Sequence, residues 1–162
     1  MKKYIRLLLV FVFIFLFSAC SKSNKNIFEN TSWTGDGGSL LEFKKDNMYW
    51  YQNGNEKSQN YYAANYKSFT GEKAIDYLVN DLKDYGVTRS EIERVIKAND
   101  KYTQENFVIF DFDFYEFDLY GEKQDIPNSH VAWFGFLLND GTYLDVANMN
   151  TGSYYGFTKN TK

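Results

Sequence analysis

The stretch that decides the fold is HVAWFGFLLNDGTYLDVA, residues 130–147. Two runs rich in aromatic and β-branched residues, 130–138 and 142–147, flank the turn sequence Asn139-Asp140-Gly141. Aromatic and β-branched residues favour strands, and Asn, Asp and Gly between two such runs are typical of a β-hairpin. The sequence therefore predicts two adjacent antiparallel strands in the last third of the chain.

The same pattern recurs on both sides of this hairpin. Short turn sequences again separate runs that are rich in aromatic residues or in which apolar and polar residues alternate. Within the longest run the apolar parity changes after Phe114, which predicts a β-bulge. The further predicted strands cover residues 40–43, 48–51, 60–69, 106–120 and 153–159.

Midway along the chain the hydrophobic period changes from that of a strand to that of a helix. A first helix is predicted over residues 72–85. A second is predicted over residues 89–98, because Thr88 and Glu91 have the spacing of a capping box. The two helices form a pair inserted between strands.

Residues 31–162 are therefore predicted to form a single α+β domain. Its expected architecture is an antiparallel β meander of seven to eight strands, barrel or half-barrel-like, with the inserted helical pair. The chain has one cysteine, so an intramolecular disulfide is excluded. A domain of this length can nevertheless bury a self-sufficient core.

The start of the chain has the three zones of a secretory signal peptide. Lys2, Lys3 and Arg6 precede an apolar run over residues 7–17, and Ser18-Ala19 follows it. A membrane-spanning helix needs about 20 apolar residues, so this run is too short to span a bilayer.

The sequence Leu16-Phe17-Ser18-Ala19-Cys20 resembles the lipobox of bacterial lipoproteins. The resemblance implies that residues 1–19 are a removed signal peptide and that Cys20 carries diacylglycerol with fatty acyl chains such as palmitate. Residues 20–30 would then be the lipidated cysteine and a polar tether. Two acyl chains give stable anchoring, so the expected location is the extracytoplasmic face of a cell membrane, in the cell envelope. A plain cleaved signal with a chance cysteine is the alternative.

A second resemblance concerns the start of the domain. Trp33 and Gly35 near the first strand, followed by a hairpin meander, resemble small lipocalin-like lipoproteins. In lipocalins the helix lies near the end of the domain, whereas here the helices are predicted in the middle. The resemblance therefore does not lead us to predict a ligand cup.

Charge and motifs limit the catalytic and nucleic-acid classes of function. The net charge of −3 argues against nucleic-acid binding. Asp111 and Asp113 share one face of a strand and are weak candidates for a Ca²⁺ site, which needs six to eight oxygen ligands. The single histidine, His130, has no nucleophile motif beside it. We therefore assign no catalytic residue, metal or cofactor, and we expect a monomer.

The aromatic content of 20% is the remaining functional signal. Such side chains are enriched at binding surfaces, although an aromatic-rich core is the alternative. The leading hypothesis is a non-enzymatic binding module for a peptide, a glycan or an envelope protein, of the immunity or inhibitor type. A small envelope hydrolase using Asp111, Asp113, Glu116 or Asp118 and a structural surface protein are the alternatives. The candidate binding residues are Trp33, Trp50, Tyr61, Tyr62, Trp133, Tyr154 and Tyr155.

Overall fold

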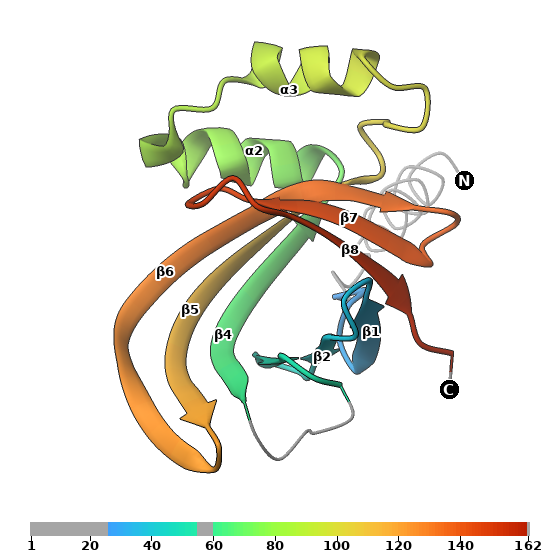
Figure 1. The fold of residues 1–162 in the computed structure, drawn as a ribbon. Coiled ribbons are helices and arrows are strands. Elements are labelled where there is room, and N and C mark those ends of the chain that lie inside the picture. The colour runs from blue at the N-terminus through green and yellow to red at the C-terminus, as the bar shows by residue number, and fades with distance from the viewer. Residues whose placement is uncertain (1–25, 55–59, 162) are drawn as a thin grey trace, which may run out of the picture.

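The computed structural model describes residues 26–54 and 60–161, without the side chains of residues 127 and 128. In this part of the chain eight antiparallel strands follow one another in sequence order, and β8 pairs with β1 to close a barrel (Figure 1). The predicted α+β meander is confirmed, and the barrel is closed. The strands are β1 (Thr31–Gly35), β2 (Leu40–Phe43), β3 (Asn47–Tyr51), β4 (Tyr61–Thr70), β5 (Phe107–Leu119), β6 (Glu122–Leu138), β7 (Tyr143–Asn148) and β8 (Tyr154–Lys159).

The turn in the deciding stretch connects β6 to β7 as predicted. Asn139, Asp140 and Gly141 all have positive φ, at 51°, 53° and 83°. Asn, Asp and Gly tolerate this left-handed conformation better than other residues. Leu138 and Tyr143 pair directly across the turn, so the local sequence sets the register of the hairpin.

Strand β6 is longer than predicted, because it begins at Glu122 and not at residue 130. Pro127 lowers the expectation of a strand, since proline cannot donate to a ladder and is confined to edges and bulges. Here the β5–β6 register shifts between Phe114 and Glu116, and the partners on β6 jump from Ser129 to Asp125. The proline lies in this irregularity, and the bulge predicted from the change of parity is confirmed.

The barrel interior is filled mainly by aromatic rings. Phe43 and Phe110 stack at 5.3 Å, and Phe110 and Phe112 stack at 5.7 Å. Tightly packed rings of this kind bury much apolar area and also interact specifically. The fully or largely buried members of this cluster include Phe28, Trp33, Leu41, Phe43, Met48, Val108, Phe110, Phe112, Trp133, Leu144, Val146 and Phe157.

The folded domain begins earlier than the predicted boundary at residue 31. Phe28 is 1% exposed, and its ring lies 4.7 Å from that of Phe110. The side-chain amide of Asn26 donates to the hydroxyl of Tyr66 at 2.8 Å. Residues 26–30 are therefore part of the domain and not of a tether. The predicted signal peptide, Cys20 and the rest of the predicted tether lie outside the described residues.

The helical layer covers the outer face of β4 and β5. It consists of α2 (Glu72–Asn80), a 3₁₀ turn η2 (Lys83–Tyr85) and α3 (Arg89–Lys97), and it forms two levels above the barrel in Figure 1. Ala74, Ile75 and Leu78 of α2 pack in a second apolar cluster with outward side chains of β5 and β6. In the described part of the chain, no helix combines the length and apolarity needed to span a membrane.

The two predicted helices differ in how well the sequence placed them. The one predicted over residues 72–85 is divided, because Leu82 has non-helical angles (φ −103°, ψ 30°) after the weak helix formers Asn80 and Asp81. The capping box is confirmed: Thr88 Oγ1 accepts from the Glu91 amide, and Glu91 Oε2 accepts from the Thr88 amide at 2.8 Å. The hydrogen bonds from Thr88 also lower the pKa of Glu91.

The close approach of β6 and β7 at Gly135 gives a test of the barrel packing. A Cβ atom at Gly135 would clash with the carbonyl oxygen of Asp145 and lie 2.7 Å from Cα of Val146. We expect Gly135→Ala to lower the free energy of unfolding by about 1–3 kcal/mol, because backbone has to move. Gly37→Ala is the control, since nothing lies within 4 Å of a Cβ there. Denaturant unfolding measures both, and equal stability of the two variants would contradict this packing.

Candidate functional site

A cavity of about 280 Å³ opens into the barrel interior. This volume lies just below the range of about 300–1,000 Å³ found for small-molecule sites. Its lining combines aromatic and aliphatic side chains with two uncharged polar residues, and no charged residue of the described chain is among them. The lining residues are Trp50, Tyr62, Phe114, Ile126, Ser129, Val131, Trp133 and Asn148.

The cavity lies toward the end of the strands that is remote from the N-terminal segment. On β4, Tyr62 lines the cavity, whereas the hydroxyl of Ser68 donates to the side chain of Asn26 at 2.8 Å. Six residues of extended strand separate these two positions by about 20 Å. Phe28 therefore fills one end of the interior, and the aromatic cavity occupies the other.

Three rings form a compact cluster at the cavity. The rings of Trp50 and Trp133 lie 5.3 Å apart at 88°, and those of Trp133 and Tyr155 lie 4.9 Å apart at 24°. Trp50 also meets Tyr155 edge to face, at 5.4 Å and 77°. Such edge-to-face and stacked pairs hold the rings in defined orientations.

The indole N–H groups of this cluster differ from that of the remaining tryptophan. Among the described residues, the Nε1 atoms of Trp50 and Trp133 are buried without a hydrogen-bond partner. Trp33 instead donates from Nε1 to Thr31 Oγ1 at 2.8 Å. A buried donor without an acceptor costs about 1–3 kcal/mol. Two such donors in contacting rings beside a cavity mark this place as a candidate ligand site.

The seven aromatic residues singled out from the sequence divide into an inner and an outer set. Trp50, Tyr62 and Trp133 line the cavity, and Tyr155 packs against two of them. Trp33 lies deeper in the interior, with its ring 5.9 Å from that of Phe28.

The other two candidates, Tyr61 and Tyr154, face outward. Tyr61 belongs to a small cluster outside the barrel core, and Tyr154 is 80% exposed. The alternation of strand side chains puts each on the opposite face from its neighbour, Tyr62 or Tyr155.

Sequence reasoning missed several residues of the cavity wall. Ile126, Ser129 and Val131 come from β6, and the first two precede the strand predicted at residue 130. Their same-side positions are also obscured by the irregularity around Pro127. The change of apolar parity after Phe114 was the available signal, because it predicts an irregularity in β5 at the point where this strand pairs with the missed part of β6.

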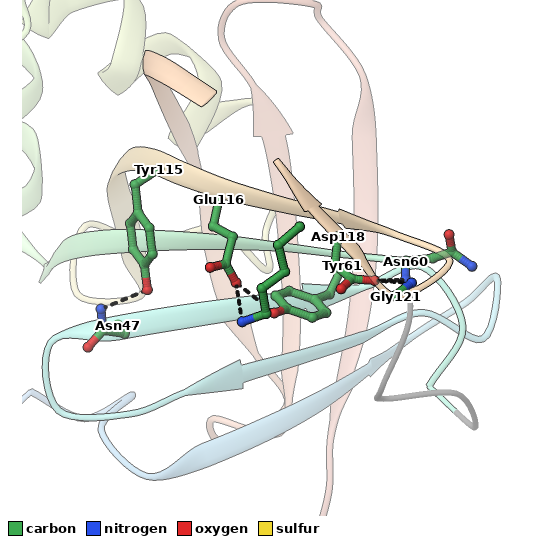
Figure 2. Close-up of polar contacts among 8 residues, drawn as sticks. Asn47, Asn60, Tyr61, Tyr115, Glu116, Asp118 and Gly121 are labelled. Carbon is green, nitrogen blue, oxygen red and sulfur yellow. Dashed lines mark hydrogen bonds and ion pairs between the residues drawn. The ribbon is translucent and has the colours of Figure 1, made fainter. Parts of the chain in front are cut away.

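On the outer face, Tyr61 is engaged in an ion-pair network and not left free (Figure 2). Its hydroxyl donates to Glu116 Oε1 at 2.6 Å, and Lys123 Nζ lies 3.1 Å from the same oxygen. The hydrogen bond from Tyr61 lowers the pKa of Glu116, and the same bond raises the pKa of Tyr61. This network links β4, β5 and β6.

Asp118 also stabilises the end of the β5–β6 hairpin. It is a buried carboxylate whose Oδ1 accepts from the backbone amides of Asn60 at 3.3 Å and Gly121 at 2.9 Å (Figure 2). It thus fixes the turn between the two strands and the start of β4. Asn47 and Tyr115 form a further contact on this face, at 3.2 Å. Two of the four acids proposed for hydrolysis, Glu116 and Asp118, therefore have structural partners.

Asp111 is the centre of a polar cluster beneath α2. It is 6% exposed, and its carboxylate contacts the hydroxyl of Tyr77, Nε2 of His130 and, at 3.9 Å, Nζ of Lys67. Burial, followed by the hydrogen bond to Asp111, raises the pKa of Tyr77. A carboxylate that orients an imidazole can form the base of an acid–base site, although water or a bound molecule would have to supply the nucleophile.

The surroundings of this cluster do not gather further metal ligands. Asp113, the other weak Ca²⁺ candidate, is exposed and pairs in register with His130. Over residues 26–54 and 60–161, no group of three or more His, Cys, Asp or Glu side chains is placed to hold a metal ion. His130 is 45% exposed beside a hollow that Asp81 and Asp84 also line.

The fold and the cavity define a class of protein: a closed eight-stranded meander barrel with an aromatic, uncharged cavity at one end and a helical layer outside. No protein-family model, curated protein or solved structure matches the chain. The functional argument therefore rests on the geometry of the cavity and of the Asp111 cluster.

The two neighbouring acids on β5 provide a test of the Asp111 cluster. We expect Asp111→Ala to lower the free energy of unfolding by about 1–3 kcal/mol, because the Tyr77 hydroxyl loses its buried acceptor. Asp113→Ala, on the same face but exposed, should change it by less than about 0.5 kcal/mol. Urea unfolding of both variants measures the difference. Indistinguishable midpoints would show that the cluster does not stabilise the helical layer.

Proposed function

We propose that the chain is a membrane-anchored extracytoplasmic lipoprotein that acts as a non-enzymatic binding module. The single observation that carries the binding role is the cavity, whose described lining is apolar or uncharged and contains two tryptophan residues. Apolar, concave sites with few polar groups are the usual places where proteins take up ligands. The ligand would place an apolar group in the cavity, against the side chains of Trp50, Tyr62 and Trp133.

The anchoring part of the proposal rests on Cys20 and its lipobox-like surroundings. A diacylglycerol on Cys20 would hold the domain at the extracytoplasmic face of a membrane. Since the N-terminal segment joins the domain at the end remote from the cavity, the cavity of a tethered protein would be turned toward the outside. It would then meet peptides, glycans or envelope proteins that approach from the aqueous side.

An immunity or inhibitor role fits this arrangement. A tethered module that captures the apolar group of an incoming toxic peptide, or of an envelope hydrolase, needs a preformed site and no chemistry of its own. Strand pairing on both sides of every strand ties the backbone of the cavity walls into one closed sheet, which favours preorganised binding.

A small envelope hydrolase is the second candidate, and the contact between Asp111 and His130 favours it. The acids available to it are fewer than the sequence suggested, because Glu116 and Asp118 are held by Tyr61, Lys123 and backbone amides. The two functions differ in their readout, since a binder saturates without forming product.

The anchor is tested by Cys20→Ala. Without the thiol no diacylglycerol can be attached, so we expect the protein to leave the membrane fraction or to remain an unprocessed precursor. Fractionation and mass spectrometry of the N-terminus measure this. Ser21→Ala serves as the control that should keep the wild-type distribution. Unchanged membrane retention and processing of Cys20→Ala would refute the lipidation proposal.

The cavity is tested with the apolar dye N-phenyl-1-naphthylamine and the full chain in lipid nanodiscs, with protein-free nanodiscs as the baseline. We expect saturable one-to-one binding, weakened about tenfold or more by Ile126→Asp, because a carboxylate in the apolar wall resists desolvation. Tyr154→Ala, on the exposed outer face, should bind as the wild type does.

Circular dichroism of each variant establishes that it is folded. Dye binding that Tyr154→Ala abolishes and Ile126→Asp leaves intact would move the binding site to the outer face and contradict the cavity.

A further inference from the structure

The two unpartnered indole N–H groups indicate what a ligand of the cavity contains. An indole nitrogen can only donate a hydrogen bond. Trp133 is 1% exposed and Trp50 is half-buried, and both line the cavity. Their Nε1 atoms have no acceptor among the described residues, whereas the indole of Trp33 is satisfied by Thr31. The two tryptophans whose N–H groups lack a partner are therefore the two that line the cavity.

The packing around these donors prevents solvent from satisfying them. The two rings meet at 5.3 Å and 88°, and Tyr155 lies 4.9 Å from one and 5.4 Å from the other. Both nitrogens are buried by this arrangement. An acceptor carried in by a ligand would reach an indole N–H once that ring turns toward the cavity, and it would then form a hydrogen bond without first breaking one.

The charge of the lining decides what kind of acceptor fits. Among the residues that the structure describes, those that line the cavity include no Lys, Arg or His, and the two polar ones are Ser129 and Asn148. A carboxylate buried without a cation is strongly disfavoured, while a neutral carbonyl is accommodated once it is hydrogen-bonded. The hydroxyl of Ser129 can in turn accept from an amide N–H.

We infer that the ligand presents an apolar, ring-sized or branched group joined to an uncharged carbonyl, as in a hydrophobic residue of a peptide with its backbone amide. This inference deepens the proposed binding function and rests on it. The apolar group fills the space beside Phe114, Ile126 and Val131, and the carbonyl oxygen accepts from the indole of Trp50 or Trp133.

Three matched probes test the inference with the full chain in lipid nanodiscs. 3-Phenylpropanamide has a ring and a neutral carbonyl, propylbenzene has the ring alone, and 3-phenylpropanoate has a charged carboxylate. Their affinities are measured by displacement of N-phenyl-1-naphthylamine. One neutral hydrogen bond corresponds to about a 2–10-fold gain, so the amide is expected to bind more tightly than both other probes by about this factor.

An isosteric replacement separates the N–H from the ring that carries it. The benzothiophene analogue of tryptophan, with sulfur in place of N–H, is introduced at residue 133 and, separately, at residue 50. We expect the preference for the amide over propylbenzene to shrink or vanish in at least one of them, while the affinity for propylbenzene stays the same. The same replacement of Trp33 is the control and should leave the preference unchanged.

The outcomes are distinguishable. Equal affinity for the amide and propylbenzene, or an amide preference that survives both replacements, overturns the inference while the cavity remains a binding site. Tightest binding of 3-phenylpropanoate overturns the requirement for an uncharged acceptor. If neither the dye nor any probe binds, the inference and the proposed binding function fail together.

Discussion

The pairing of β5 with β6 is the constraint on which the rest of the structure depends. These two strands form the longest ladder in the barrel, and its one register shift, at Tyr115, sets which side chains point inward on either side of it. On the Phe107 side of the shift, Val131 and Trp133 point into the barrel, and His130, next to Val131, points out toward Asp111. One strand therefore supplies a wall of the cavity and a member of the outer polar cluster.

The two faces of this ladder are stabilised by different interactions. Inside, aromatic rings pack closely, and the buried side-chain polar atoms without a partner among the described residues are the indole nitrogens of Trp50 and Trp133. Outside, each buried carboxylate has partners: Asp111 contacts Tyr77 and His130, and Asp118 accepts from two backbone amides. Buried charges are tolerated when they are paired in this way, so the unpaired donors of the interior are the exception that points to a ligand.

Local sequence signals predicted most of the fold, and the failures have local causes. The Asn139–Gly141 turn, the Thr88–Glu91 capping box and the bulge after Phe114 are each encoded within a few residues, and each was confirmed. The first half of β6 was missed because Pro127 conceals it, and the role of Phe28 was missed because burial of one ring in a polar segment depends on distant partners. The alternation of side chains along a strand places Tyr61 and Tyr62 on opposite faces, and this can be read from the sequence. The contact of Trp50 with Trp133 cannot, because these two residues come together only in the closed barrel.

The burial of Phe28 has a consequence for the range over which a lipidated form of this protein could act. Because Asn26 already belongs to the domain, a chain lipidated at Cys20 would be joined to it through residues 20–25, a number of residues that spans at most roughly 20 Å. This length is smaller than the diameter expected for the barrel with its helical layer. The domain would stay within a layer about one protein thick next to the bilayer. It would meet its targets by lateral diffusion in two dimensions and would not reach molecules in the bulk fluid beyond that layer.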